Sequence, residues 1–285
     1  MTFVIQKNND IHGLFIHIPK CGGRSTIKLF EENSYQMTRP FGWTYFGHYK
    51  LNYSLRVSRK HYPLEKMKNW KIYIPLRDPI DWMESNYRYY TEVPLMEHAL
   101  KWEHENLKKM GIVKYMDTMM DCILNGTDLP SPSPKRGNGI NGCEAWRSME
   151  DYFTLSENDV TGLENVEVIM WTNKTMNKLL DVINPDHKDS YTVPWVNKTV
   201  RKNNVLDETS NNINLFEEYK EKLYNVNFRH HLDKMDTLFN DGIYRGKLTD
   251  FVVEDYPELK NMNSCLLYTS PRPRDRQKSR MPSSA

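Results

Sequence analysis

The sequence predicts an α/β fold in which helices cover both faces of a central parallel sheet. Three short apolar segments, 13–18, 71–76 and 166–171, have the length and composition of buried strands. A segment with helical periodicity follows each of them, and strands that alternate with helices favour a parallel sheet. With 285 residues, the chain is long enough to form one such domain with its own core.

The first strand and the helix after it are indicated by their boundaries. The segment 13–18 (GLFIHI) is apolar, and Pro19 with the glycines after it ends the strand. The following segment, 25–33 (STIKLFEEN), predicts a helix with Leu29 and Phe30 among its apolar positions. A strand that leads through a glycine loop into a helix is therefore expected near the N-terminus.

The second strand, 71–76 (KIYIPL), also leads directly into a helix. Asp78 is a favourable N-cap residue, Pro79 suits the first helical position, and Asp81 adds a negative charge to the first turn. The helix is therefore expected to begin immediately after the strand.

The remaining elements are predicted from periodicity. Over residues 97–123 the periodicity predicts either one long helix or two helices, with Leu107 and Met110 on the apolar side. The third strand, 166–171 (VEVIMW), leads into another helix, and a last helical stretch is expected at 212–239.

The charge distribution separates a C-terminal tail from the rest of the chain. The formal net charge is +2, but the last 22 residues hold five Lys and Arg against one Asp. Residues 1–263 therefore carry a small acidic excess, which is not the basic surplus expected of a nucleic-acid-binding domain. The tail, 264–285, is rich in Ser, Pro and Arg and has no apolar period. We expect a single domain over 1–263, a non-native or disordered tail, and no nucleic acid among the partners.

Cysteines, histidines and hydropathy exclude several classes of protein. Outside the tail, Cys21, Cys122 and Cys143 are too few for a disulfide framework, although a Cys122–Cys143 pair stays open. The nine histidines show no metal-ligand spacing, so no metal is expected. No run of 18 apolar residues exists, so we expect no membrane segment in this chain. The oligomeric state is left open.

The loop after the first strand has the composition of an anion site. Gly22 and Gly23 allow the backbone N–H groups to approach an anion, and the following helix contributes the positive end of its dipole. Lys20 adds a full charge, and Ser25 and Thr26 add hydroxyl donors. The physics is that of a Walker phosphate loop, but the lysine precedes the glycines and no G-x-x-x-x-G-K-[ST] occurs.

A second anion site is predicted at the end of the second strand. Arg77 ends the strand, and Ser85 lies two helical turns after Asp78, so its hydroxyl returns to the side of the helix near Arg77. A guanidinium and a hydroxyl on one side suit a phosphate. Two anion sites on neighbouring strands imply a ligand with two separated phosphate groups.

Four segments resemble carbohydrate sulfotransferases that use 3′-phosphoadenosine 5′-phosphosulfate (PAPS). HIPKCGGRS (17–25) resembles their 5′-phosphosulfate loop, and LRDPIDWMESNYRYY (76–90) resembles their 3′-phosphate motif. WTYFGHYKLNY (43–53) is similar to a segment of the heparan sulfate and dermatan or chondroitin uronyl 2-O-sulfotransferases. VPWVNKTVRK (193–202) is similar to the loop that closes over the nucleotide in that group. The resemblance implies the sulfotransferase fold, a P-loop-like three-layer α/β/α architecture.

The resemblance also implies a reaction and its residues. The sulfuryl group of PAPS would pass in line to a hydroxyl of a glycosaminoglycan-like acceptor, leaving adenosine 3′,5′-bisphosphate, and no metal is needed. His48 matches the histidine that takes the acceptor proton, and Lys20 would stabilise the charge on the departing 5′-phosphate. The expected contacts to PAPS are Lys20, Cys21, Gly22, Gly23, Arg24, Ser25, Thr26, Arg77, Ser85, Asn197, Lys198 and Thr199.

The sequence departs from the family pattern at four positions. Arg24 stands where a threonine is usual, Trp82 where an arginine is common, and Phe46 where the heparan sulfate enzyme has the first of two histidines. Pro75 interrupts the second strand and removes a ladder N–H group. These departures leave the acceptor open: a uronic acid, another sugar or a small alcohol.

Two other functions and two compartments stay open. One alternative is a P-loop-like nucleotide kinase, and the other is a catalytically silent module that binds a nucleotide or a glycan on the same fold. The family resemblance implies the Golgi lumen, with the N-terminal anchor absent from this chain. A complete chain of this sequence would instead be expected in the cytosol.

Overall fold

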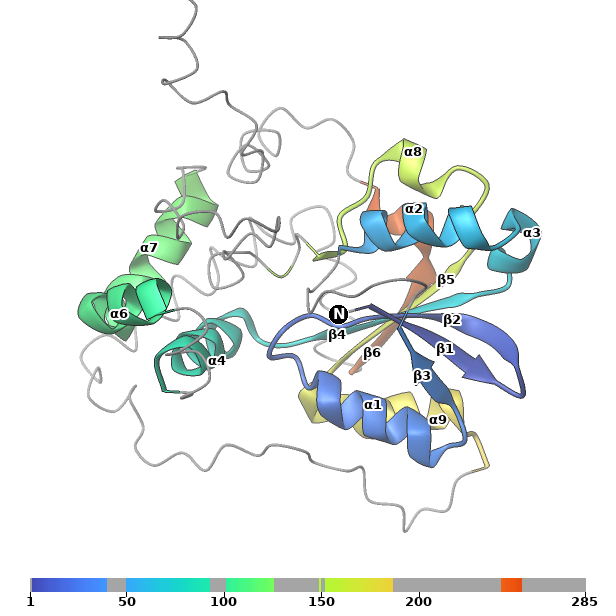
Figure 1. Cartoon of the computed structure of the whole chain (residues 1–285), viewed down its shortest axis with the longest axis horizontal. Helices are drawn as coiled ribbons and strands as arrows, with labels where there is room; N and C mark the ends of the chain where they lie inside the picture. Colours follow the sequence, from blue (N-terminus) through green and yellow to red (C-terminus); the bar gives the residue numbers. More distant parts are fainter. Residues whose placement is uncertain are drawn as a thin grey trace, which may run out of the picture.

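The computed structural model describes residues 2–39, 50–92, 101–125, 149, 152–186 and 242–252. In this part of the chain a six-stranded sheet runs in the order β3-β1-β2-β4-β5-β6, with helices on both of its faces (Figure 1). The strands are β1 (Thr2–Lys7), β2 (Asp10–Ile16), β3 (Gln36–Thr38), β4 (Lys71–Leu76), β5 (Glu167–Thr172) and β6 (Ile243–Lys247). The predicted α/β class is confirmed.

The sheet is mixed: the three predicted strands are parallel, but antiparallel strands flank them. β2, β4 and β5 are parallel and form its centre, whereas β1, β3 and β6 pair antiparallel with their neighbours. β1 and β2 form a hairpin because Asn8 and Asn9 both take positive φ values, 53° and 66°, as a tight two-residue turn requires. The sequence prediction contained none of the three antiparallel strands.

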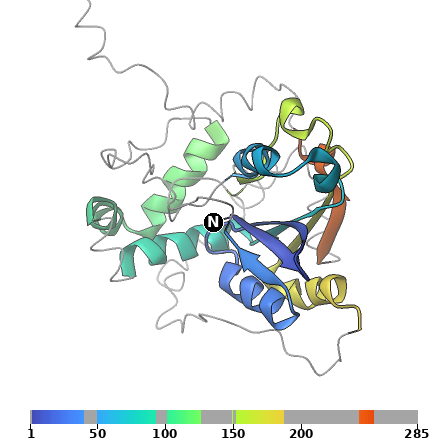
Figure 2. The ribbon, with the colours of Figure 1, turned by 45° about the vertical axis from the view of Figure 1, so that its right-hand side comes forward.

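Helices cover the two faces of the sheet. α1 (Gly23–Glu32) and α9 (Met176–Ile183) lie on one face, and α2 (Leu51–His61), α3 (Leu64–Met67) and α8 (Glu157–Val160) lie on the other, as Figures 1 and 2 both show. α4 (Pro79–Glu92), α6 (Lys101–Met110) and α7 (Ile112–Asn125) lie beyond the end of β4. Short 3₁₀ turns follow β5 and β6 at Asn173–Thr175 and Leu248–Phe251.

Two apolar clusters fill the space between the sheet and its helices. Successive strand residues point to opposite faces, so Val4 joins one cluster while its neighbours Phe3 and Ile5 join the other. The cluster with Phe3 and Ile5 also contains Phe30 from α1 and Leu180 from α9. The sheet is therefore buried on both faces, as a parallel centre requires.

Several predicted boundaries are confirmed. β4 has the predicted bounds, and β5 is shifted by one residue. Asp78 caps α4, because its Oδ1 accepts hydrogen bonds from the backbone N–H groups of Ile80 (3.0 Å) and Asp81 (3.2 Å). The helix predicted over 212–239 lies outside the described residues.

Two boundaries differ from the prediction. β2 ends at Ile16 rather than at residue 18 and begins earlier, because the hairpin with β1 pairs it from Asp10 onward. For residues 97–123 the sequence allowed one long helix or two, and the described residues form two, α6 and α7. Gly111 separates them with a φ of 78°, which an α-helix does not accommodate.

Pro75 does not interrupt β4, which corrects a second expectation. The strand continues through Pro75 to Leu76 and pairs there with Trp171 and Thr172 of β5. The pairing of β4 with β2 ends at Tyr73. Beyond Tyr73, β4 has a strand partner on one side only, where a residue without an N–H group is tolerated as it is at a sheet edge.

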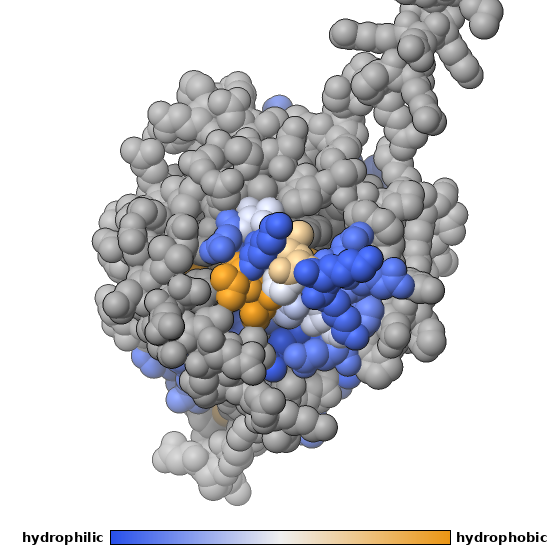
Figure 3. Space-filling model, turned by 90° about the vertical axis from the view of Figure 1, so that its left-hand side faces the viewer, coloured by the Kyte–Doolittle hydropathy of each residue, from blue (hydrophilic) through white to orange (hydrophobic). Residues whose placement is uncertain are grey.

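The end of the molecule that carries α4, α6 and α7 has a mainly hydrophilic surface over its described residues, around a small apolar patch (Figure 3). Exposed side chains on α6 and α7 include Glu105, Lys108, Lys109 and Lys114. Within the described ranges, no helix has both the length and the apolar character needed to cross a bilayer.

Candidate functional site

The predicted phosphate loop joins β2 to α1 and lies beside the start of α4. β2 and β4 are adjacent and parallel, so the loops that follow them leave the same edge of the sheet. Hydrogen bonds from Arg77 and Trp82 to the carbonyls of Lys20 and Pro19 confirm that the two loops meet. Ligands of α/β sheets bind at this carboxyl edge.

The backbone of the loop has the shape of an anion site. Lys20 and Gly22 take positive φ values of 64° and 79°, and the N–H of Cys21 donates to the carbonyl of Ile18 at 3.4 Å. Gly22 is the N-cap of α1 and offers no side chain to bond the first N–H groups of the helix, and the first turn contains no acidic residue. The positive end of α1 is therefore left available to an external anion.

Two side chains of the β4–α4 segment hold the loop in place. The indole Nε1–H of Trp82 donates to the carbonyl oxygen of Pro19 at 2.7 Å, and both residues are buried. The guanidinium of Arg77 donates through Nη1 to the carbonyl oxygen of Lys20 at 3.3 Å. Two successive carbonyls of the loop are thus turned toward the β4–α4 segment.

Lys20 is a half-buried cation close to two other cations, Arg77 and Arg24. Its pKa is lowered from 10.5 to about 8, first by burial and then by the positive charges of Arg77 and Arg24, while Cys21 acts in the opposite direction. The ammonium Nζ lies 4.6 Å from the centre of the Tyr89 ring, a cation–π contact. An anion bound beside Lys20 would therefore stabilise the charged form of its side chain.

Arg24 is exposed in the first turn of α1, and its charge contributes to the lowered pKa of Lys20. Arg24 therefore increases the positive potential of the loop.

Gly23 is required by the packing of His17. A Cβ atom at Gly23 would lie 1.9 Å from two atoms of the His17 ring. That ring lies parallel to Phe15, with 5.9 Å between ring centres and an interplanar angle of 17°. The glycine lets α1 begin close against the end of β2, which brings its N-terminus to the loop.

The Thr26 hydroxyl and the Cys21 thiol of the motif contact other parts of the fold. Thr26 is fully buried, and its hydroxyl donates to the carbonyl of Gly22 at 3.2 Å. Ser25 is also buried. The Cys21 thiol lies 3.8 Å from the sulfur of Met149, and burial raises its pKa to about 12, so it stays protonated and unreactive.

One face of α4 is directed toward the loop. Ser85 is half-buried, three residues after Trp82 and four before Tyr89, so the three side chains share a helix face. Among the tyrosines of α4, Tyr87 packs against Tyr115 with 5.6 Å between ring centres, and Tyr90 is buried. In the described chain, Tyr89 is the tyrosine with a contact to Lys20.

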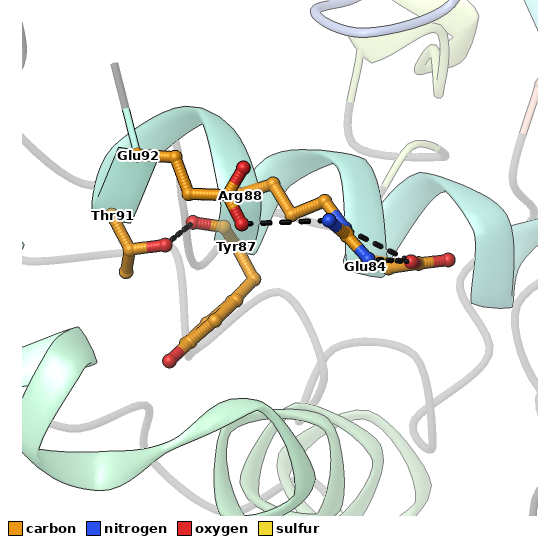
Figure 4. Close-up of polar contacts among 5 residues, drawn as sticks. All are labelled: Glu84, Tyr87, Arg88, Thr91 and Glu92. Atoms are coloured by element: carbon orange, nitrogen blue, oxygen red, sulfur yellow. Dashed lines mark hydrogen bonds and ion pairs between the residues drawn. The ribbon is translucent and has the colours of Figure 1, made fainter. Parts of the chain in front are cut away.

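Another side of α4 carries an ion-pair network, shown in Figure 4. Arg88 bonds the carboxylate of Glu84 through Nε and Nη2, both at 3.0 Å, and reaches Glu92 at 3.5 Å. The hydroxyl of Thr91 donates to the carbonyl of Tyr87 at 2.8 Å. The Glu84 side chain is only 6% exposed, so its charge needs this partner. All of these contacts join residues of α4, so they stabilise the helix that carries Trp82, Ser85 and Tyr89.

Four of the predicted site residues lie outside the described residues: His48, Asn197, Lys198 and Thr199. The structure thus brings together the residues of the phosphate loop and Arg77, and it places Ser85 on the adjoining helix face. In the described ranges, no group of three or more His, Cys, Asp and Glu side chains could hold a metal ion.

Sequence reasoning missed the contacts of Trp82 and Tyr89 with the loop. From the sequence, Trp82 stands out only as a departure from the motif that segment 76–90 resembles, and Tyr89 is assigned no role. Their spacing from Ser85 was the available signal, since residues three and four apart share a helix face. The indole donor in particular needs an acceptor when it is buried, which favoured a contact with a loop carbonyl.

Comparisons with known proteins give no further information on the family. No family model, no curated protein and no solved structure matches this chain. The α/β class therefore rests on the sheet and its flanking helices, and the site rests on its own geometry.

Proposed function

We propose that the protein is a PAPS-dependent sulfotransferase that transfers a sulfuryl group to a hydroxyl of a carbohydrate acceptor. The observation that carries the proposal is the half-buried Lys20 ammonium, which lies against the Tyr89 ring in a glycine loop at a helix N-terminus, near Arg77 and Arg24. The sequence motifs that resemble the sulfotransferases are the second support.

The order of the loop residues favours a sulfotransferase over a P-loop-like kinase. In the Walker loop the lysine follows the glycines and opens the helix, whereas Lys20 precedes Gly22 and lies before α1. Arg77 directly follows the neighbouring strand β4, and Ser85 lies in α4, where a second phosphate group of the same nucleotide would be held. PAPS carries such a separated 3′-phosphate.

The proposed reaction is an in-line displacement at sulfur. The acceptor oxygen forms a bond to sulfur while the bond from sulfur to the 5′-phosphate oxygen breaks, and that oxygen keeps the electron pair. Lys20 and the first N–H groups of α1 would stabilise the charge on the leaving phosphate. His48, the base expected from the sequence, would accept the proton of the hydroxyl.

The test is transfer of radiolabelled sulfate from PAPS to a panel of desulfated glycans and small hydroxyl compounds. We expect labelled product with at least one acceptor, loss of transfer in His48→Ala, and an unchanged shift in melting temperature with adenosine 3′,5′-bisphosphate in that variant. Nucleotide binding without transfer to any acceptor would favour the silent module. Magnesium-dependent ATP turnover with no response to PAPS would favour the kinase.

A further inference from the structure

We propose that Trp82 is a positioning residue of the phosphate loop, and that its indole N–H holds the loop in the conformation that binds the anion. The inference rests on the proposed function, because it names a residue that prepares the same site. In the sequence Trp82 was unexplained, since an arginine is common at this position of the 3′-phosphate motif.

The hydrogen bond from Trp82 to Pro19 is specific and is buried away from water. The indole has a single donor, and that donor is used on the carbonyl of Pro19 at 2.7 Å. Trp82 is 2% exposed and Pro19 is buried, so water does not compete for either group. A buried hydrogen bond of this kind costs free energy when one partner is removed, because the other is left unsatisfied.

The direction of the bond matters for anion binding. A carbonyl oxygen that points into the loop would repel a phosphate, whereas one bonded to α4 points away from it. The Pro19 carbonyl is held by Trp82, and the next carbonyl, of Lys20, is held by Arg77 at 3.3 Å. With both carbonyls bonded to the β4–α4 segment, neither oxygen is turned toward an anion bound at the N-terminus of α1.

The same helix face also holds the side chain of Lys20. Tyr89 lies seven residues after Trp82, two turns along α4, and its ring lies under the Lys20 ammonium. α4 therefore fixes the backbone of the loop through Trp82 and the charged group through Tyr89. Release of the Trp82 bond would allow the loop to move away from α4 and would expose Lys20 to water.

Trp171 supplies a matched control, because it separates the hydrogen bond from the bulk of a buried tryptophan. It is fully buried in β5, lies parallel to Phe15 with 6.3 Å between ring centres, and belongs to the other apolar cluster. Its Nε1 has no hydrogen-bond partner among the described residues. Trp171→Phe thus removes the same volume as Trp82→Phe without removing a hydrogen bond.

The experiment compares Trp82→Phe with Trp171→Phe by two measurements. The first is the affinity for adenosine 3′,5′-bisphosphate, which we expect Trp82→Phe to lower about tenfold and Trp171→Phe to leave unchanged. The second is the pH dependence of Lys20 acetylation, read by mass spectrometry without any nucleotide. We expect its midpoint to move upward from about 8 toward 10.5 only in Trp82→Phe.

A further variant removes only the donor. Site-specific replacement of Trp82 by benzothienylalanine keeps the ring and its volume but has sulfur in place of the N–H, so it tests the inference even if Trp82→Phe fails to fold. Equal effects of the Trp82 and Trp171 variants, or an unchanged Lys20 midpoint with benzothienylalanine, would overturn the inference. If the parent protein binds no adenosine 3′,5′-bisphosphate, the proposed function fails, and the acetylation measurement still decides the role of Trp82.

Discussion

Replacement of Lys20 by methionine should stabilise the protein while it removes anion binding. The lowered pKa of Lys20 means that its charged form is disfavoured in the folded protein relative to the unfolded chain. Methionine keeps the length of the side chain without the charge. A residue retained for packing would show the opposite effect, because its removal would destabilise the fold.

The size of this stabilisation follows from the lowered pKa of Lys20. The change in the pKa of Lys20 from 10.5 to about 8 means that the folded protein disfavours the charged form by about 3 kcal/mol at neutral pH. Loss of the cation–π contact with Tyr89 in the variant offsets about 1 kcal/mol of this gain. We therefore expect Lys20→Met to raise the free energy of unfolding by about 2 kcal/mol at neutral pH.

The sign of the pH dependence is fixed by linkage. Between about pH 8 and pH 10.5 the unfolded chain binds the Lys20 proton more strongly than the folded protein. In this pH window the stability contributed by Lys20 therefore rises with pH. Below about pH 8 the folded protein bears the full cost of the charged Lys20, and above pH 10.5 this cost is gone. The advantage of Lys20→Met should therefore shrink as the pH rises through the window.

Urea unfolding at neutral pH and at pH 10.5 measures this difference. Lys28→Met is the control, because Lys28 is also on the α1 side of the site but its side chain is 52% exposed. We expect it to change stability by less than about 0.5 kcal/mol at either pH. A Lys20→Met protein that is less stable than the parent at neutral pH, or a difference independent of pH, would refute the reasoning.

Three further predictions concern the packing around the site. Gly23→Ala should destabilise by about 1–3 kcal/mol, and His17→Ala should recover part of the loss in the double variant, because the new Cβ meets the His17 ring; additive effects in urea unfolding would contradict this. Gly13→Ala should be more damaging, since its Cβ would lie 1.9 Å from the backbone oxygen of Lys71 and disturb the β2–β4 pairing; a normal thermal unfolding curve would count against that register. The Cys21 thiol, with its pKa raised to about 12, should resist iodoacetamide at pH 8 until urea unfolds the chain, and peptide mapping that finds it alkylated in the native protein would show it to be accessible.

The parallel centre of the sheet was predictable, and its antiparallel edges were not. The segments that became β4 and β5 are continuous apolar runs, which is the pattern of strands buried on both faces. β3 has only three residues and β6 carries Arg245 and Lys247, so neither has that pattern. β1 is apolar, but the Asn8–Asn9 turn that pairs it with β2 was not recognised as a hairpin signal.

The composition of the site was predictable, but its contacts were not. Glycines, a lysine and a helix start identify an anion loop from local sequence alone. The bond of Trp82 to Pro19 spans 63 positions, and the effect of Arg77 on Lys20 spans 57. Such contacts depend on how β2 and β4 lie side by side, which no local pattern encodes.

The binding of adenosine 3′,5′-bisphosphate, measured by calorimetry, tests the central claim most directly. The account predicts one site, with affinity that increases as the pH falls through about 8, because the anion restores the proton to Lys20. Lys20→Met should lose this binding, and ADP with magnesium should bind more weakly. No heat of binding at millimolar nucleotide, or a preference for ADP with magnesium, would contradict the account.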